Sequence, residues 1–163
     1  MVCCGLFNGR AHVVIIALDV GEKRIGVAVC DELELIATPR AYIRRKTTMG
    51  ALDAVVQEIT REEAQLVVVG LPVSFDGTLH AQGQAVQAFG EKLRRRIALP
   101  LIYADETLTS VRAEERLREA GVRPERIRER IDSEAAAIIL EDVLEQRRRE
   151  RREHAQDATD REE

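Results

Sequence analysis

Three acidic residues lie where predicted strands end or a predicted helix begins, and together they could bind a metal ion. Asp19 closes the apolar run 13–18, Glu106 follows the apolar run 99–104, and Asp132 opens a predicted helix. A carboxylate at the end of a buried strand loses hydration, so it needs a cation or hydrogen-bond donors to compensate. Carboxylates without histidine or thiolate are the ligands that Mg²⁺ or Mn²⁺ prefers.

Such a site could hydrolyse a phosphodiester bond without a nucleophile from the protein. In two-metal sites the ions lie about 3.5–4 Å apart, and one activates water while the other stabilises the leaving oxygen. We therefore predict Asp19, Glu106 and Asp132 as catalytic residues and as metal ligands. Asp105 and Glu106 are neighbours, and neighbours in an extended segment point in opposite directions, so only one should reach the metal. We assign that role to Glu106.

Each acid also has a structural explanation. Asp132 could be a helix N-cap or a first-turn acid, and Asp105 or Glu106 could cap the helix that follows them. A single buried acid such as Asp19 also arises for structural reasons. Taken one at a time, the structural explanations are the better ones for Asp132 and Glu106, but three acids at the ends of elements favour a shared site.

Alternating strands and helices are predicted to bring these acids together. The strands are expected over residues 13–18, 25–30, 33–43, 66–70 and 99–104, and the helices over residues 49–63, 80–96, 109–120 and from 132 onward. Thr109 or Ser110 would cap the third helix. Three antiparallel strands followed by two parallel ones give an α/β fold, a mixed five-stranded sheet with helices on both faces. This layout is RNase H-like, and ligands collect beyond the carboxyl ends of such strands.

Length and composition fit one domain. The chain has 163 residues, of which 45% are hydrophobic and 3% aromatic, so the core is aliphatic and stacking on bases is excluded as a main binding mode. We expect an N-terminal extension over 1–12, the domain over 13–147 and a charged, disordered tail over 148–163. Three cysteines without metal-ligand spacing suit a reducing compartment, and no apolar stretch could cross a membrane. We expect a cytoplasmic protein without a membrane partner.

Arginine supplies most of the positive charge, although the formal net charge is −4. A negative chain does not coat nucleic acid through bulk charge, but arginine binds phosphate through paired hydrogen bonds, so local patches remain candidates. Two basic residues lie beside Asp19, and an arginine-rich loop before Asp132 would form a mobile clamp. The predicted nucleic-acid-binding residues are Lys23, Arg24, Arg126, Arg128 and Arg130.

Four segments, in order, resemble the YqgF/RuvX family. They are LDVGEKRIGVA at 18–28, VGLP with DG at 69–77, DETLT at 105–109 and DSEAA at 132–136. The resemblance implies an RNase H-like fold similar to that of the RuvC Holliday-junction resolvases, with Asp19, Glu106 and Asp132 as the acidic triad. It implies a Mg²⁺- or Mn²⁺-dependent nuclease that matures the 5′ end of pre-16S rRNA, or alternatively a resolvase of branched DNA. Thr107 departs from the family, which commonly has arginine there.

Two other classes of function stay open. A non-catalytic RNA-binding factor of ribosome assembly would keep the fold but cleave nothing, and Thr107 together with the negative net charge motivates it. Residues 19–21 also resemble the first phosphate loop of actin-like phosphotransferases, but those enzymes clamp ATP between two lobes and this chain has room for one. A homodimer would place two active sites together, as a symmetric junction requires, and it stays an open alternative.

Overall fold

The computed structural model describes residues 13–74 and 76–160, so the predicted N-terminal extension over 1–12 lies outside the described residues. The strands are β1 (Ile15–Val20), β2 (Arg24–Cys30), β3 (Ala37–Pro39), β4 (Ile43–Arg44), β5 (Leu66–Leu71) and β6 (Leu101–Asp105). The helices are α1 (Thr48–Arg61), α2 (Ala81–Arg94), α3 (Thr109–Glu119) and α4 (Pro124–Asp160). Within the described residues, no helix is both long and apolar enough to span a membrane.

The strands form a mixed sheet in the order β3-β2-β1-β5-β6, with β4 also paired to β2. β1 pairs with β2 antiparallel and with β5 parallel, and β5 pairs with β6 parallel. The predicted α/β fold is confirmed, but the single strand expected over 33–43 is two short strands, so the sheet of the described residues has six strands. β3 ends at Pro39, the Arg40 amide still donates to the Val27 carbonyl oxygen of β2 at 2.8 Å, and the ladder with β2 resumes at Ile43.

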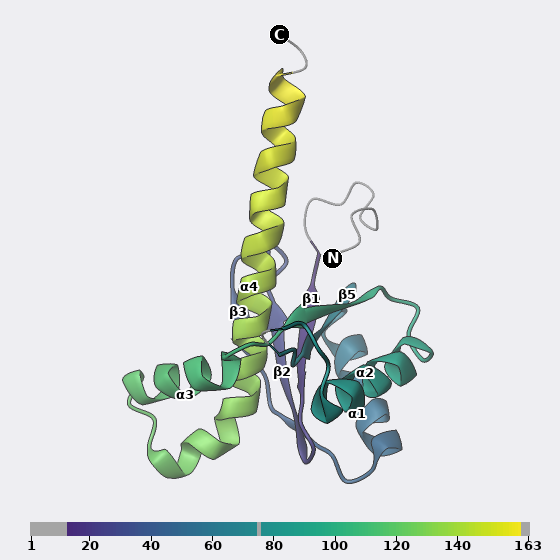
Figure 1. Ribbon diagram of the computed structural model, residues 1–163, viewed down its shortest axis with the longest axis vertical. Helices are drawn as coiled ribbons and strands as arrows, with labels where there is room; N and C mark the ends of the chain where they lie inside the picture. The colour runs from purple at the N-terminus through teal and green to yellow at the C-terminus, as the bar shows by residue number, and fades with distance from the viewer. Residues whose placement is uncertain (1–12, 75, 161–163) are drawn as a thin grey trace.

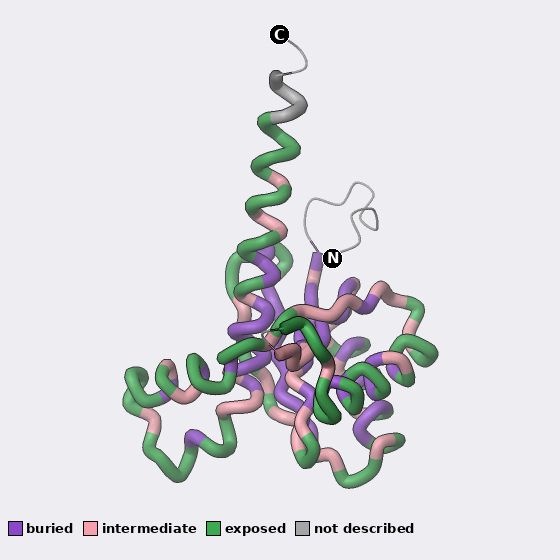
Figure 2. Tube along the Cα trace, viewed as in Figure 1, coloured by how far each residue is buried: buried purple, intermediate pink, exposed green. Residues whose placement is uncertain are grey.

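Helices cover both faces of the sheet, as predicted (Figure 1). On one face, α1 and α2 pack side chains such as Leu52 and Phe89 against Ile16 and Leu18 of β1. On the other face, α4 packs its apolar residues, among them Ile139, against alternate residues of the central strands. The central strands are therefore buried from both sides, which explains their continuous β-branched sequence (Figure 2).

Helix α4 differs most from the prediction, because it is longer at both ends. It begins at Pro124, a residue type suited to the first turn of a helix, so the arginine-rich loop predicted before Asp132 is wrong. It also continues as helix to Asp160, where a disordered tail was predicted from 148. The ion pair of Arg149 with Glu145, four residues apart, and the hydrogen bond from Gln146 to Glu150 stabilise this polar part, which stands clear of the body (Figure 1).

Candidate active site

The three predicted acids come together near the carboxyl ends of the central strands. Asp19 is the second-last residue of β1, and Glu106 directly follows β6. β1 and β6 run parallel to β5 between them, so their ends lie at the same edge of the sheet. Asp132 lies on α4. The negative charge of Asp132 raises the pKa of Asp19, and the negative charge of Asp19 raises the pKa of Glu106. The structure thus places all three acids in one electrostatic cluster.

Two glycines make room for this convergence. A Cβ atom on Gly26, the β2 partner of Asp19, would lie 1.9 Å from the carbonyl oxygen of Asp132. Only glycine at position 26 therefore lets α4 approach β2 closely enough to deliver Asp132. A Cβ atom on Gly70 would lie 2.7 Å from Glu106 Oε2, so the end of β5 leaves space for that carboxylate.

Burial makes the ionised form of each acid costly. It raises the pKa of Asp19 to about 7, with a further contribution from the Asp132 charge. Burial also raises the pKa of Glu106 to about 8, reinforced by Asp19 and Asp105. The pKa of Asp132 is raised as well, because burial outweighs the nearby Arg24 cation. The cluster holds more negative charge than its surroundings compensate.

The donor chemistry of the cluster fits a hard divalent cation. Glu106 Oε2 is buried and has no hydrogen-bond partner, as expected of a ligand oxygen awaiting a cation. Asp132 Oδ2 lies 2.8 Å from Arg24 Nε, an ion pair that engages this acid. Across residues 13–74 and 76–160, no three acidic, histidine or cysteine side chains are close enough to ligate one ion directly. In the described part of the chain the three acids therefore do not form a closed ligand set, and Asp132 is paired with Arg24.

The neighbours Asp105 and Glu106 lie in different environments. Asp105 is exposed, and its Oδ1 accepts a hydrogen bond from the Thr107 amide at 2.8 Å and another from the Thr107 hydroxyl. Glu106 instead has a buried carboxylate oxygen and is coupled to Asp19. This arrangement supports Glu106 as the acid that faces the cluster. Through these two hydrogen bonds Thr107 orders the turn after β6.

The alternative that these acids cap helices is wrong. The N-cap of α3 is Leu108, with a φ of 62°, and it makes no side-chain cap hydrogen bond. Thr109, which we predicted as a cap, is the first residue of α3, and its hydroxyl donates to the Glu106 carbonyl oxygen at 2.8 Å. Asp132 lies inside α4, well beyond its first turn, so it is neither an N-cap nor a first-turn acid.

The predicted nucleic-acid-binding residues lie in two groups. Lys23 is exposed at the β1–β2 turn, and the Arg24 guanidinium stacks 5.3 Å from the centre of the Tyr42 ring. The other group lies on the first turns of α4, where it is exposed and helical rather than in a loop; it consists of Arg126, Arg128 and Arg130. Tyr42 was not among the residues predicted from sequence. Arg45, in the basic run 44–46 that was a candidate for nucleic-acid contact, donates from its guanidinium to the Gly21 carbonyl oxygen at 3.1 Å.

The raised pKa values predict how stability depends on pH in the absence of metal. Folding favours the protonated carboxyls, so this stabilisation is complete below their unfolded pKa values, near 4, and is lost as pH rises through about 7 for Asp19 and about 8 for Glu106. Urea unfolding in chelator should therefore give a free energy that falls between pH 5 and pH 9. Asp19→Asn should flatten this slope, and an unchanged slope would contradict the burial of Asp19.

A mixed sheet with acids clustered at the carboxyl ends of its central strands defines an α/β protein of the RNase H-like class. Residues 13–146 match the family model "RuvX: Holliday junction resolvase", and the chain belongs to this family. The resemblance inferred from the four sequence segments is thereby confirmed.

Curated relatives and solved structures agree with this assignment. The chain is 40% identical over 134 residues to the "Putative pre-16S rRNA nuclease" of Roseiflexus sp. (strain RS-1), covering 82% of this chain and 95% of that protein. A protein of the same name from Chloroflexus aurantiacus is 42% identical over 135 residues, covering 83% of this chain and 88% of that protein. The fold matches T. thermophilus RuvC in complex with a Holliday junction substrate with a TM-score of 0.55 and 16% identity, covering 83% and 96% of the chains.

Proposed function

We propose that this protein is a metal-dependent nuclease that hydrolyses phosphodiester bonds in structured nucleic acid, with pre-16S rRNA as its substrate. The observation that carries the proposal is the half-buried pair of Asp19 and Glu106, in which the buried Glu106 Oε2 has no hydrogen-bond partner and both carboxyls have pKa values raised by burial without a compensating cation. The relatives named as pre-16S rRNA nucleases support the substrate. The family description makes branched DNA the second candidate.

In this proposal the acids bind Mg²⁺ or Mn²⁺ and the basic residues bind the substrate. When bound, a divalent cation would polarise the scissile phosphate and activate water. Asp19 and Glu106, with Asp132, hold the cation through carboxylate oxygens. Near neutral pH the metal-free pair retains a proton, because the pKa of Glu106 is about 8. Lys23 and Arg24 orient the phosphate backbone beside these acids.

Arg24 acts in two ways in this scheme, because it pairs with Asp132 when no metal is bound. The pair is partly exposed, with 33% of the Arg24 side chain and 24% of the Asp132 side chain accessible, so solvent weakens it. Arg24→Gln should tighten Mn²⁺ binding roughly threefold to fivefold in calorimetry while slowing cleavage, because the competing cation and a phosphate contact are both lost.

Lys23→Gln is the matched control, since Lys23 forms no ion pair with a carboxylate among the described residues. It should leave Mn²⁺ affinity unchanged and weaken only nucleic-acid binding. Unchanged or weaker Mn²⁺ binding by Arg24→Gln would show that Arg24 does not compete for Asp132.

The substrate is tested by presenting purified protein with two matched labelled molecules. One is an RNA containing the 5′ end of pre-16S rRNA, and the other is a four-way DNA junction, each with Mg²⁺, with Mn²⁺ and with chelator. Metal-dependent cleavage of the RNA alone supports the proposal, and cleavage of the junction alone supports the resolvase. Tight RNA binding without cleavage in any metal would favour the non-catalytic assembly factor.

A further inference from the structure

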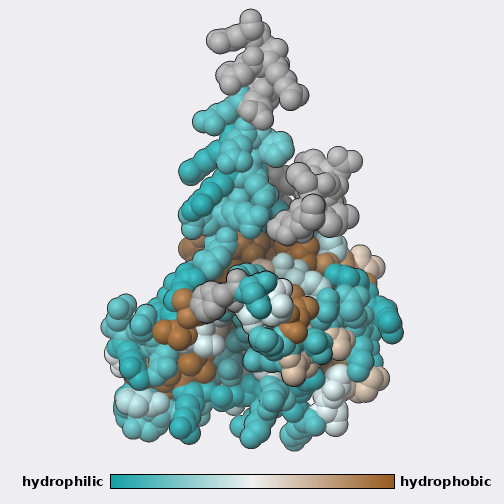
Figure 3. All heavy atoms as spheres, viewed as in Figure 1, coloured by the Kyte–Doolittle hydropathy of each residue, from teal (hydrophilic) through white to brown (hydrophobic). Residues whose placement is uncertain are grey.

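The C-terminal part of α4 is a polar helix that projects from the body of the protein (Figures 1 and 3). α4 has 37 residues, and at about 1.5 Å per residue it rises roughly 24 Å from Asp132 to Arg148 and roughly 30 Å to Arg152. The family match ends at residue 146, so the projecting segment lies beyond what the family accounts for. Its sequence and attachment therefore need their own explanation.

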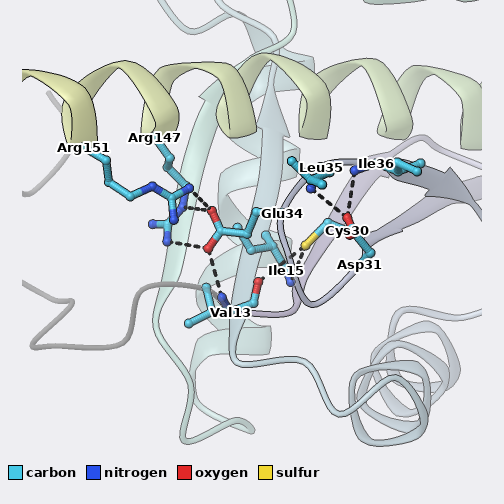
Figure 4. Close-up of polar contacts among 9 residues, drawn as sticks. All are labelled: Val13, Ile15, Cys30, Asp31, Glu34, Leu35, Ile36, Arg147 and Arg151. Carbon is cyan, nitrogen blue, oxygen red and sulfur yellow. Dashed lines mark hydrogen bonds and ion pairs between the residues drawn. The ribbon is translucent and has the colours of Figure 1, made fainter.

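A buried acid fixes the direction of this projecting segment. Glu34, in the turn between β2 and β3, is completely buried, and its carboxylate accepts hydrogen bonds from Arg147 Nε and Nη2 at 3.1 and 3.0 Å (Figure 4). Arg151 forms a second ion pair with Glu34, and the amide of Val13 donates to it at 2.9 Å. Two turns of α4 are thus clamped to the edge of the sheet opposite the acidic cluster.

Other arginines of this segment, half-exposed or exposed, lie outside the clamp. Residues 147–153 contain five arginines and two glutamates, in a chain whose net charge is −4. Arg148, Arg149 and Arg152 line a shallow hollow on one side, together with Glu145. Arg149 pairs with Glu145, whereas Arg148 and Arg152 have no ion pair within the described part of the chain. We call Arg148, Arg149 and Arg152 the arginine face.

The chemistry of this face suits phosphate. Arginine presents a planar fork of donors that matches phosphate oxygens, and clustered cations gain affinity by releasing counterions from nucleic acid. Residues 147–160 contain no Phe, Tyr or Trp, so the segment cannot stack on unpaired bases as single-strand binders do. Contact with the backbone alone is the mode that fits a duplex.

We propose that the arginine face binds the phosphate backbone of a duplex segment of the substrate, remote from the scissile bond. This inference rests on the proposed nuclease function and specifies how its substrate is held. The rise of about 24–30 Å from Asp132 corresponds to about seven to nine nucleotides at ~3.4 Å each along a duplex strand. A substrate must therefore extend at least that far from the active site to reach the face.

The test measures binding without cleavage, in chelator, by fluorescence anisotropy of the full chain. The variant Arg148→Gln/Arg152→Gln is compared with Lys92→Gln/Arg95→Gln, which removes the same charge from exposed positions at the end of α2, on the other face of the sheet. Glutamine keeps helix propensity, and circular dichroism checks that each variant folds. The probes are a hairpin from the 5′ region of pre-16S rRNA with about fifteen base pairs and a version shortened to about five, below the span of the face.

The arginine-face variant should bind the long hairpin roughly tenfold more weakly. The slope of the logarithm of its binding constant against the logarithm of salt concentration should be shallower by about 1.8, the value for two lost phosphate contacts. The α2 control should bind like wild type, and the short hairpin should not distinguish any of the proteins. Equal affinities for the long hairpin, equal losses in both variants, or the same loss on the short hairpin would overturn the proposal.

Self-association is the competing use of this surface, and sedimentation distinguishes it. A lower molar mass for the arginine-face variant with an unchanged salt slope would assign the face to a second copy of the chain and overturn phosphate binding. Because no readout depends on cleavage, a protein that binds through this face but cleaves nothing would refute the nuclease function while still showing that the arginine face binds a duplex.

Discussion

Glu106→Gln should slow phosphodiester cleavage by about a thousandfold, whereas Asp105→Asn should change the rate no more than about threefold. The two residues are adjacent, yet Glu106 has a buried, unpartnered oxygen coupled to Asp19, and Asp105 is exposed and bonded to Thr107. Loss of the Glu106 charge would remove a cation ligand, and an amide is a poor replacement. Single-turnover rates with saturating Mn²⁺ measure both variants.

Stability separates this loss of activity from misfolding. Glu106→Gln removes a charge whose burial is costly, so in chelator at pH 9 the variant should be at least as stable as wild type. If the two variants lost activity equally, or if Asp105→Asn were the slower enzyme, the assignment of Glu106 to the site would be wrong.

Gly26→Ala should destabilise the protein by about 3 kcal/mol, the largest stability effect we expect from a single methyl group. The added Cβ would lie 1.9 Å from the Asp132 carbonyl oxygen and 2.8 Å from the Ser133 amide nitrogen. Both atoms belong to the backbone of α4, so the whole helix must shift away from β2. Urea unfolding in chelator measures the change in free energy.

Gly70→Ala is the comparison variant, because its Cβ would meet the ends of two side chains instead of backbone. These are Ile139 Cδ1 at 2.5 Å and Glu106 Oε2 at 2.7 Å, which can move by rotamer changes. We expect a cost of about 1 kcal/mol, together with reduced cleavage because Glu106 is displaced. A smaller cost for Gly26→Ala than for Gly70→Ala would contradict the close docking of α4 on β2.

The convergence of Asp19 and Glu106 could be predicted from sequence because it follows from local rules. Each acid ends or follows a short apolar run, and the carboxyl ends of parallel strands meet at one edge of a sheet. The opposite directions of Asp105 and Glu106 followed from the alternation of side chains along a strand. These inferences needed only neighbours in sequence and the geometry of a β-strand.

The course of α4 could not be predicted in the same way. Its first turns carry so many arginines and glutamates that the apolar spacing of Ile127 and Ile131 is hard to recognise, and the segment looked like a loop. Its extension past residue 147 depends on Glu34, which lies 113 residues from Arg147 and is buried by tertiary packing. The ion pair of Arg24 with Asp132 is likewise a long-range contact that no local pattern encodes.

The most direct test of the active-site assignment compares wild type with Asp19→Asn, purified in parallel, for Mn²⁺-dependent cleavage of RNA containing the 5′ end of pre-16S rRNA. We expect wild type to cleave only with metal and Asp19→Asn to be inactive at every Mn²⁺ concentration while remaining folded. Cleavage by Asp19→Asn at the wild-type rate would contradict the assignment, because the hydrolysis would then arise elsewhere than at Asp19, Glu106 and Asp132.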